Sequence, residues 1–251
     1  MFNNLTPVTR NVIILNVMVY VLANFLFPGW YAMLSAYYPF SPNFRSWQVI
    51  THMFMHARLG ESLGFMHILF NMLTLASFGP VLEHVLGNKR YMWLYLLSGL
   101  GSFLLFNLWN FYEINQLAGA LNQMGVDTAD IFRKADVNYR GDMNIDAKST
   151  EGVAMVRALM AGLQTPMLGA SGAIFGVVAA FAAMFPDAKL MFMFVPFPIK
   201  AKILFPIIII VSVYLGFNGD MSGIAHFAHV GGALVGFILA KFWKKDQYRI
   251  N

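Results

Sequence analysis

The chain has 251 residues, of which 58% are apolar and 12% charged, and its formal net charge at pH 7 is +5. This composition excludes an ordinary soluble domain and favours a membrane protein with several transmembrane helices. The sequence contains no cysteine, which excludes disulfide bonds and thiolate metal sites.

Six apolar runs have the length expected of membrane-spanning helices, since a helix needs about 20 residues to cross a hydrocarbon layer about 30 Å thick. Glycine, proline and charged residues separate the runs. They lie near residues 11–28, 64–82, 91–111, 168–185, 202–217 and 223–243. Pro206 in the fifth run predicts a kinked or loosened helix. We therefore predict an all-α bundle of six transmembrane helices that forms a single domain over residues 1–251.

Two long loops are expected on the outer side of the membrane. Residues 28–64 are rich in aromatic residues and histidine, which favours a loop that packs at the membrane interface. Residues 112–166 form the most polar part of the chain and are interpreted as an extramembrane insertion. Within this insertion, residues 114–124 and 150–163 show helical spacing of apolar residues, which predicts a small helical hairpin.

The distribution of lysine and arginine predicts the orientation of the chain. Counted in alternate loops, these residues favour a cytoplasmic location for both termini. The chain is then a multi-pass integral membrane protein, which we assign to a bacterial inner membrane, in contact with membrane lipids. The positive net charge follows from this bias, and no nucleic-acid partner is expected. The oligomeric state is left open.

No metal site is expected. The segment 136–142 superficially resembles a calcium-binding loop, but Arg140 occupies a ligand position and Ala147 replaces the closing glutamate.

Polar residues inside apolar helices are informative, because an ionisable side chain in the hydrocarbon region costs roughly 2.5–3.5 kcal/mol. Ser171 lies at the start of the fourth run, between Gly169 and Gly172, where unpaired backbone N–H groups favour negative charge. This position suits a nucleophile whose oxyanion needs stabilisation. The alternative is a serine that only caps or packs the helix.

His229 in the sixth run is the candidate base, because imidazole can take and return a proton near neutral pH. Gly232 and Gly236 share its helix face, and the fourth run carries Gly172 and Gly176 at matching spacing. Two glycine faces permit close helix contact, which would bring His229 within reach of Ser171. The alternative is a hydrogen-bonded packing histidine.

The membrane portions of the fourth and sixth runs contain no aspartate or glutamate, so a serine–histidine dyad is predicted. Phe175, one turn after Ser171, could orient the imidazole by stacking, or it could be an ordinary packing residue. His67 and Asn71 are four residues apart on one helix face and could donate hydrogen bonds to an oxyanion. Interhelical hydrogen bonding is the alternative for this pair.

Three motifs in this order resemble the rhomboid family of intramembrane proteases. They are His67-Ile-Leu-Phe-Asn71, Gly169-Ala-Ser171-Gly172, and Ala228-His229-Val-Gly-Gly232 with Gly236 beyond. The stretches 46–56 and 79–83 also resemble the family's first loop and second helix.

The resemblance implies a six-helix core, a Ser171–His229 dyad and an oxyanion site formed by His67, Asn71 and backbone near Gly169. It also implies that the substrates are transmembrane or membrane-proximal segments of other proteins, cleaved without metal or organic cofactor. His226 is assigned a supporting role near the outer mouth of the site. The strongest alternative is an inactive relative that binds and escorts membrane proteins. A channel or transporter with proton-relaying histidines is a second alternative, but it usually shows internal repeats that this sequence lacks.

Overall fold

The computed structural model describes residues 5–61, 64–191, 197–218 and 224–247. Within these residues the chain is mostly helical, with one short antiparallel strand pair. The long apolar helices are α1 (Pro7–Phe25), α4 (Gly64–Gln123), α7 (Ser171–Met184), α8 (Ala201–Asn218) and α9 (Ile224–Gln247). The shorter elements are α2 (Trp30–Leu34), α3 (Gln48–Thr51), the 3-10 helix η2 (His52–Phe54), α5 (Thr128–Lys134), α6 (Thr150–Gln164), β1 (Lys189–Leu190) and β2 (Ile199–Lys200).

Helix α4 consists of two arms that meet at Gly87. The backbone of Gly87 has φ 76° and ψ 159°, which only glycine adopts readily, so the chain reverses there between two helical arms. The two arms correspond to the predicted runs 64–82 and 91–111. Helices α1, α7 and α8 likewise lie on the predicted runs, while the predicted start of the sixth run at residue 223 falls outside the described residues.

The second arm of α4 continues well past the predicted end at residue 111. The separate helix predicted over residues 114–124 is wrong, because this segment is the last part of α4. Ile114 and Leu121 pack into a cluster with buried residues of α6, so the apolar face does not end at the polar stretch. The helix stops only before Gly125, which has a positive φ of 76°.

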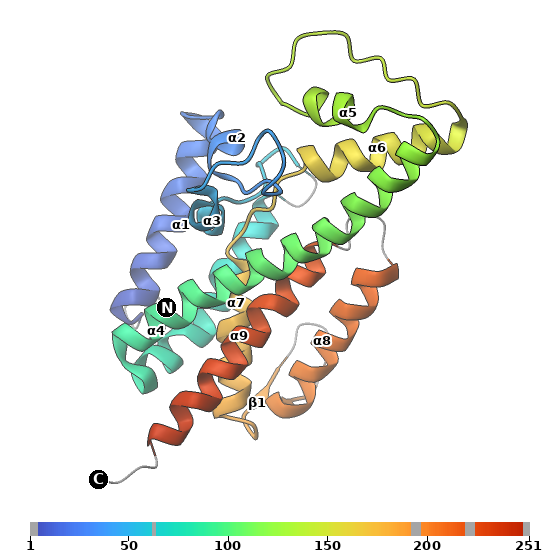
Figure 1. Ribbon diagram of the computed structural model, residues 1–251. Helices are drawn as coiled ribbons and strands as arrows, with labels where there is room; N and C mark the ends of the chain where they lie inside the picture. The colour runs from blue at the N-terminus through green and yellow to red at the C-terminus, as the bar shows by residue number, and fades with distance from the viewer. Residues whose placement is uncertain (1–4, 62–63, 192–196, 219–223, 248–251) are drawn as a thin grey trace.

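Helix α7 forms the centre of the bundle. It contacts both α4 and α9 extensively, and α1 packs against α4 on the other side. Helix α8 contacts mainly α9 and is the most peripheral of the long helices in Figure 1. Eleven of the 14 residues of α7 are buried, so other helices surround it almost completely.

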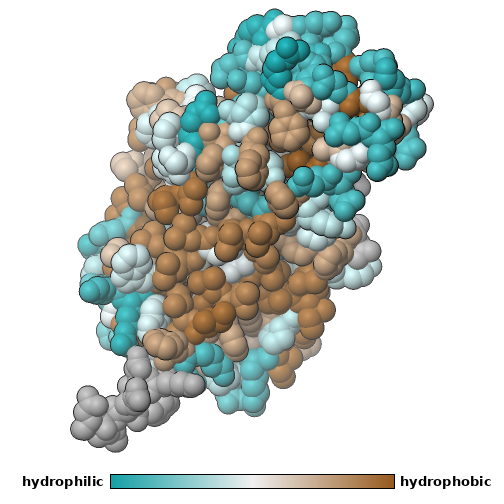
Figure 2. Space-filling view, in the orientation of Figure 1, coloured by the Kyte–Doolittle hydropathy of each residue, from teal (hydrophilic) through white to brown (hydrophobic). Residues whose placement is uncertain are grey.

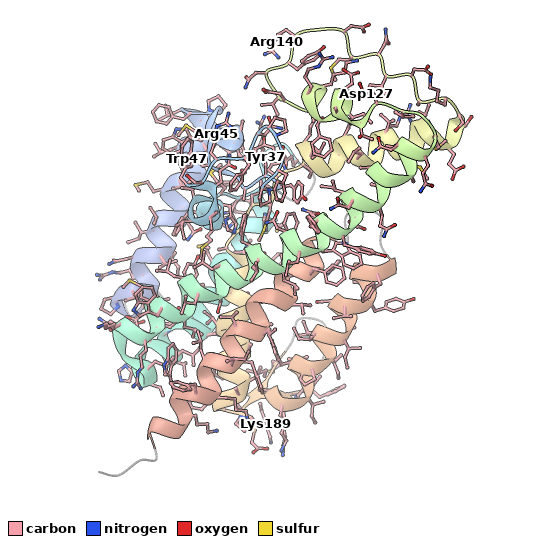
Figure 3. All side chains as sticks on the ribbon, viewed as in Figure 1. Tyr37, Arg45, Trp47, Asp127, Arg140 and Lys189 are labelled. Atoms are coloured by element: carbon pink, nitrogen blue, oxygen red, sulfur yellow. The ribbon has the colours of Figure 1, made fainter. Side chains whose placement is uncertain are left out.

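The surface of the bundle has the character of a membrane protein. Figure 2 shows a hydrophobic band across the middle of the molecule and hydrophilic caps at its two ends. Helices α1, α4 and α9 are long and apolar enough to cross a membrane, and α7 and α8 are shorter apolar helices. The start of α1 and the end of α9 lie at the end of the bundle opposite α5 and α6 (Figure 1). In Figure 3, Lys189 likewise lies opposite Asp127 and Arg140.

The loop between α1 and α4 packs onto the bundle, as the aromatic composition predicted. Tyr37 and Tyr38 are buried, and Gln48 accepts hydrogen bonds from the backbone N–H of Arg45 and Tyr37. Trp47 donates from Nε1 to a backbone carbonyl at 2.9 Å (Figure 3). The segment is therefore a folded cap over one end of the helices.

Glu83 of α4 caps the start of α1 from a neighbouring helix. Its carboxylate accepts from the backbone N–H groups of Val8 and Thr9, each at 2.8 Å, and from the hydroxyls of Thr6 and Thr9. These N–H groups belong to the first turn of α1, where no intrahelical acceptor exists and no side chain of α1 acts as the cap.

We expect Glu83→Ala to destabilise the fold by about 3 kcal/mol, because the substitution leaves buried donors of α1 without acceptors. Denaturant unfolding in detergent micelles measures the effect. The stability of Glu83→Gln, which keeps one acceptor oxygen, should lie between that of Glu83→Ala and that of the wild type. His84→Ala on the exposed neighbouring position is the control, and equal stability of all variants would contradict this role.

Candidate active site

The Ser171 hydroxyl and the His229 imidazole form a hydrogen bond between two helices. Ser171 is the first residue of α7 and His229 lies in the second turn of α9. Ser171 Oγ is 2.9 Å from His229 Nε2, the distance required for proton transfer between a nucleophile and its base. The close approach expected from the glycine spacing is therefore observed, although 58 residues separate the two.

Direct backbone contact between α7 and α9 produces this approach. A Cβ atom added at Gly232 would overlap the carbonyl oxygen of Gly172, and one added at Gly236 would overlap the carbonyl oxygen of Gly176. The helices thus touch without intervening side chains, as small-residue faces allow. Helix α7 also lies close to α4, because a Cβ at Gly172 would overlap the side chain of Ser102.

Phe175 lies against the His229 ring. The two rings are stacked with centroids 4.2 Å apart and planes within 1° of each other. Among the described residues, no carboxylate forms a hydrogen bond with His229, whose polar partner is Ser171. His226 lies edge-on to His229 at a centroid distance of 6.3 Å, and its Nδ1 is buried without a partner in the described part of the chain.

His67 and Gly169 lie beside the Ser171 hydroxyl. Gly169 has φ 121°, and a Cβ built there would sit 2.9 Å from His67 Nε2 and 3.6 Å from Ser171 Oγ. The glycine therefore permits both a backbone conformation and a proximity that other residues would disturb. Asn71 lies one turn below His67 and donates one amide N–H to the His67 carbonyl at 2.9 Å. Its second N–H remains for another acceptor.

Two buried histidines support this arrangement from the loop before α4. The His56 ring lies 5.1 Å from the His67 ring, and the carbonyl of His52 accepts from Gly169 N at 3.0 Å. Burial lowers the pKa of His56 to about 3, with the nearby His67 adding to this effect, and burial lowers the pKa of His52 to about 4. Both imidazoles are neutral at pH 7. Their position beside the site was not predicted from the sequence, although their spacing of four residues was a signal.

The chemistry available at this site is that of a serine nucleophile. Within the described residues, no group of three or more histidine, aspartate or glutamate side chains could hold a metal ion. Ser171 Oγ forms a hydrogen bond with His229 and lies near His67, and the N–H groups of the first turn of α7, which have no intrahelical acceptor, are close by.

Comparison with known proteins identifies the family. The rhomboid domain matches residues 43–120 and 149–245, more than half of the chain. The chain belongs to the rhomboid family. The rhomboid protein 1 of mitochondria from Saccharomyces cerevisiae is 27% identical over 184 residues, which are 72% of this chain and 39% of the yeast protein. The Bacillus subtilis rhomboid protein YdcA is 39% identical over 54 residues, 22% of this chain and 24% of YdcA.

The chain therefore covers well under two thirds of the length of either relative. Its membership of the rhomboid family and its apolar helices make it a multi-pass integral membrane protein. Between its two parts the rhomboid match omits residues 121–148, which comprise the last residues of α4, helix α5 and the irregular segments beside it. This part of the insertion is thus additional to the common rhomboid domain.

Proposed function

We propose that this chain is an intramembrane serine endopeptidase that cleaves transmembrane or membrane-proximal segments of other membrane proteins. The hydrogen bond of 2.9 Å between Ser171 and His229 carries the proposal. Helix α7 has 14 residues and is therefore about 21 Å long, shorter than the hydrocarbon layer of about 30 Å. A serine at the start of such a short, surrounded helix suits hydrolysis below the membrane surface.

In the proposed reaction, Ser171 Oγ attacks the scissile carbonyl while His229 Nε2 takes the hydroxyl proton. His67, Asn71 and the N–H groups near Gly169 and Ser171 stabilise the resulting oxyanion. The intermediate collapses to an acyl-enzyme as His229 returns the proton to the leaving amine. Water, deprotonated by His229, then releases the new carboxyl end and regenerates Ser171. Phe175 and His226 are proposed to orient the imidazole.

The proposed topology has six membrane-spanning helices, namely α1, the two arms of α4, α7, α8 and α9. Lysine and arginine cluster in the loops at the end of the bundle where α1 starts and α9 ends, which supports cytoplasmic termini in a bacterial plasma membrane. Residues 112–166 would then project from the opposite face.

The proposal is tested with the detergent-purified protein, a serine-directed fluorophosphonate probe and a model transmembrane substrate. We expect covalent labelling of Ser171, located by mass spectrometry, together with cleavage of the substrate. A folded protein inert toward both reagents would instead favour the inactive escort function.

We further expect Asn71→Ala and His67→Ala to lower kcat by roughly 10²- to 10³-fold with little change in KM, because an oxyanion forms only on the way to the intermediate. Asn115→Ala is the matched control for Asn71, since Asn115 also lies in α4 and donates to the carbonyl four residues earlier. A change confined to KM would show that the pair only binds substrate.

A further inference from the structure

The insertion contains an open groove that the proposed chemistry does not use. It has a volume of about 550 Å³ and lies between helix α6 and the irregular segment 143–147. One wall carries Met143 and Ile145, and the α6 wall carries Val153, Val156 and Met160. Met143 and Val153 are 51% and 40% exposed, so apolar surface faces water inside the most polar part of the molecule.

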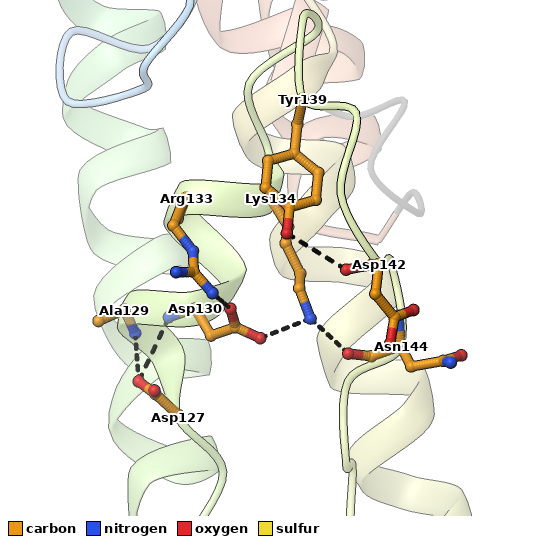
Figure 4. A network of polar contacts seen from close by, with 8 residues as sticks. All are labelled: Asp127, Ala129, Asp130, Arg133, Lys134, Tyr139, Asp142 and Asn144. Atoms are coloured by element: carbon orange, nitrogen blue, oxygen red, sulfur yellow. Dashed lines mark hydrogen bonds and ion pairs between the residues drawn. The ribbon is translucent and has the colours of Figure 1, made fainter.

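The segment 143–147 is held in place independently of any occupant. Lys134 of α5 is buried and binds both the Asp130 carboxylate, at 2.7 Å, and the backbone carbonyl of Asn144 (Figure 4). Asp127 caps α5 through the N–H groups of Ala129 and Asp130, which fixes the helix that carries Lys134. The groove is therefore preformed, which reduces the entropy cost of binding.

The backbone of this wall has free hydrogen-bonding groups. The N–H and C=O groups of Met143 and Ile145 form no hydrogen bond with any residue in the described part of the chain. Backbone N–H and C=O groups that lack partners can pair with those of an added extended segment, while side-chain pockets beside them select its residues. An extended peptide thus fits this wall better than a helix does.

The charge of the groove indicates the sign of the charge on its occupant. Arg157 is its only charged lining residue, and no ion pair to Arg157 occurs among the described residues. The insertion as a whole carries seven acidic and five basic residues, so its charges nearly balance, and Arg157 is the position in the groove that attracts a carboxylate. In Figure 2 the insertion forms a hydrophilic cap away from the hydrophobic band, which places the groove in water rather than among lipid tails.

The groove lies within a short length of chain from Ser171. Thr165, at one end of the groove, lies six residues before Ser171, a chain length that spans at most roughly 20 Å. Arg157 lies eight residues before Thr165, about 12 Å along α6. An extended chain covers about 3.3 Å per residue, so a residue bound by Arg157 lies within about ten residues of a bond held at Ser171.

We propose that this groove binds an extended, extramembrane segment of the substrate that carries apolar residues and one carboxylate, which pairs with Arg157. The inference rests on the proposed protease function, because it makes the groove a specificity site for that reaction. The groove wall 143–147 lies outside the rhomboid match, so the site is an addition of this chain to the common domain.

Binding is tested without catalysis in the full-length Ser171→Ala protein in neutral detergent. The probe is a fluorescein-labelled ten-residue peptide of alternating valine and serine with one central glutamate, and a second peptide has lysine in place of glutamate. We expect about fivefold tighter binding of the glutamate peptide by fluorescence anisotropy, and reversal of this preference in Arg157→Glu. Arg140→Glu, an exposed charge outside the groove, is the matched control and should keep the preference.

Equal binding of both peptides, or a preference that survives Arg157→Glu, would overturn the groove assignment. The assignment would also be overturned if micelles containing phosphatidylglycerol displaced the peptide and neutral micelles did not. That result would identify a lipid headgroup as the occupant. If the protein variants retain the elution volume of the parent in size-exclusion chromatography, misfolding does not explain a loss of binding.

Cleavage assays separate this inference from the proposed function. With active Ser171, a transmembrane substrate with glutamate within ten residues of the cut should have a KM about fivefold lower than its lysine counterpart, with kcat unchanged. If the KM is the same for the glutamate and lysine substrates, only the groove assignment is overturned. If peptide binding depends on Arg157 but the protein cleaves no substrate, the protease function is overturned and the binding site stands.

Discussion

Replacing Ser171 with alanine is expected to lower the rate of substrate cleavage by roughly 10⁴- to 10⁶-fold and to abolish labelling by a fluorophosphonate. The substitution removes only the hydroxyl group, and no other described side chain forms a hydrogen bond with His229 that could replace the nucleophile. Residual activity would come from oxyanion stabilisation and substrate positioning alone. Single-turnover cleavage of a transmembrane substrate in micelles measures the loss.

Ser77→Ala is the matched control for this substitution. Ser77 lies on the exposed face of α4 and donates only to a backbone carbonyl of its own helix, so its removal should leave the rate unchanged. Cleavage that persists in Ser171→Ala at the wild-type rate would exclude the dyad. His229→Ala alone should give a loss of similar size. Combining it with Ser171→Ala should add little, because the effects of residues that act as one unit are not additive.

The second large effect is expected for Gly236→Val. The new side chain would overlap the backbone of Gly176, so α7 and α9 must move apart or unfold locally. Overpacking in a well-packed interior costs about 1–3 kcal/mol, and a clash with backbone lies at the upper end of this range. The separation also breaks the hydrogen bond of 2.9 Å between Ser171 and His229, and we therefore expect cleavage to fall at least a hundredfold.

Thermal unfolding in micelles, read together with the cleavage rate, tests this expectation. Gly119→Val in α4 is the control, because a Cβ at Gly119 meets no atom within 4 Å. The free energy of unfolding of that variant should fall by only a few tenths of a kcal/mol or less, and its cleavage rate should be that of the wild type. Wild-type activity in Gly236→Val would show that the glycine contact does not position the dyad.

Much of the helical framework could be predicted from the sequence. Apolar runs of membrane length located α1, α7, α8, the first arm of α4 and the start of its second arm to within a few residues, since a helix in lipid must be apolar over its membrane-spanning length. The prediction failed at residues 112–123, which continue α4. The composition becomes polar there, but Ile114 and Leu121 still lie on one buried face. The helix continues because these residues pack against α6.

The residues of the candidate site were also recognisable in the sequence, because few polar side chains interrupt the apolar runs. Ser171, His229, His67 and Asn71 stand out for this reason. Their catalytic roles remain predictions. The sequence did not indicate that His56 lies against His67, or that Glu83 caps α1 across a distance of more than 70 residues.

The sequence by itself therefore determined most of the helical segments and singled out the side chains of the candidate site, since both depend on local composition and spacing. Only the tertiary structure decided which of these side chains meet. The contact of Ser171 with His229 requires two helices to touch through glycine backbones, and the groove beside α6 requires Lys134 to hold a distant carbonyl. Such contacts arise from the packing of whole elements, which no local pattern specifies.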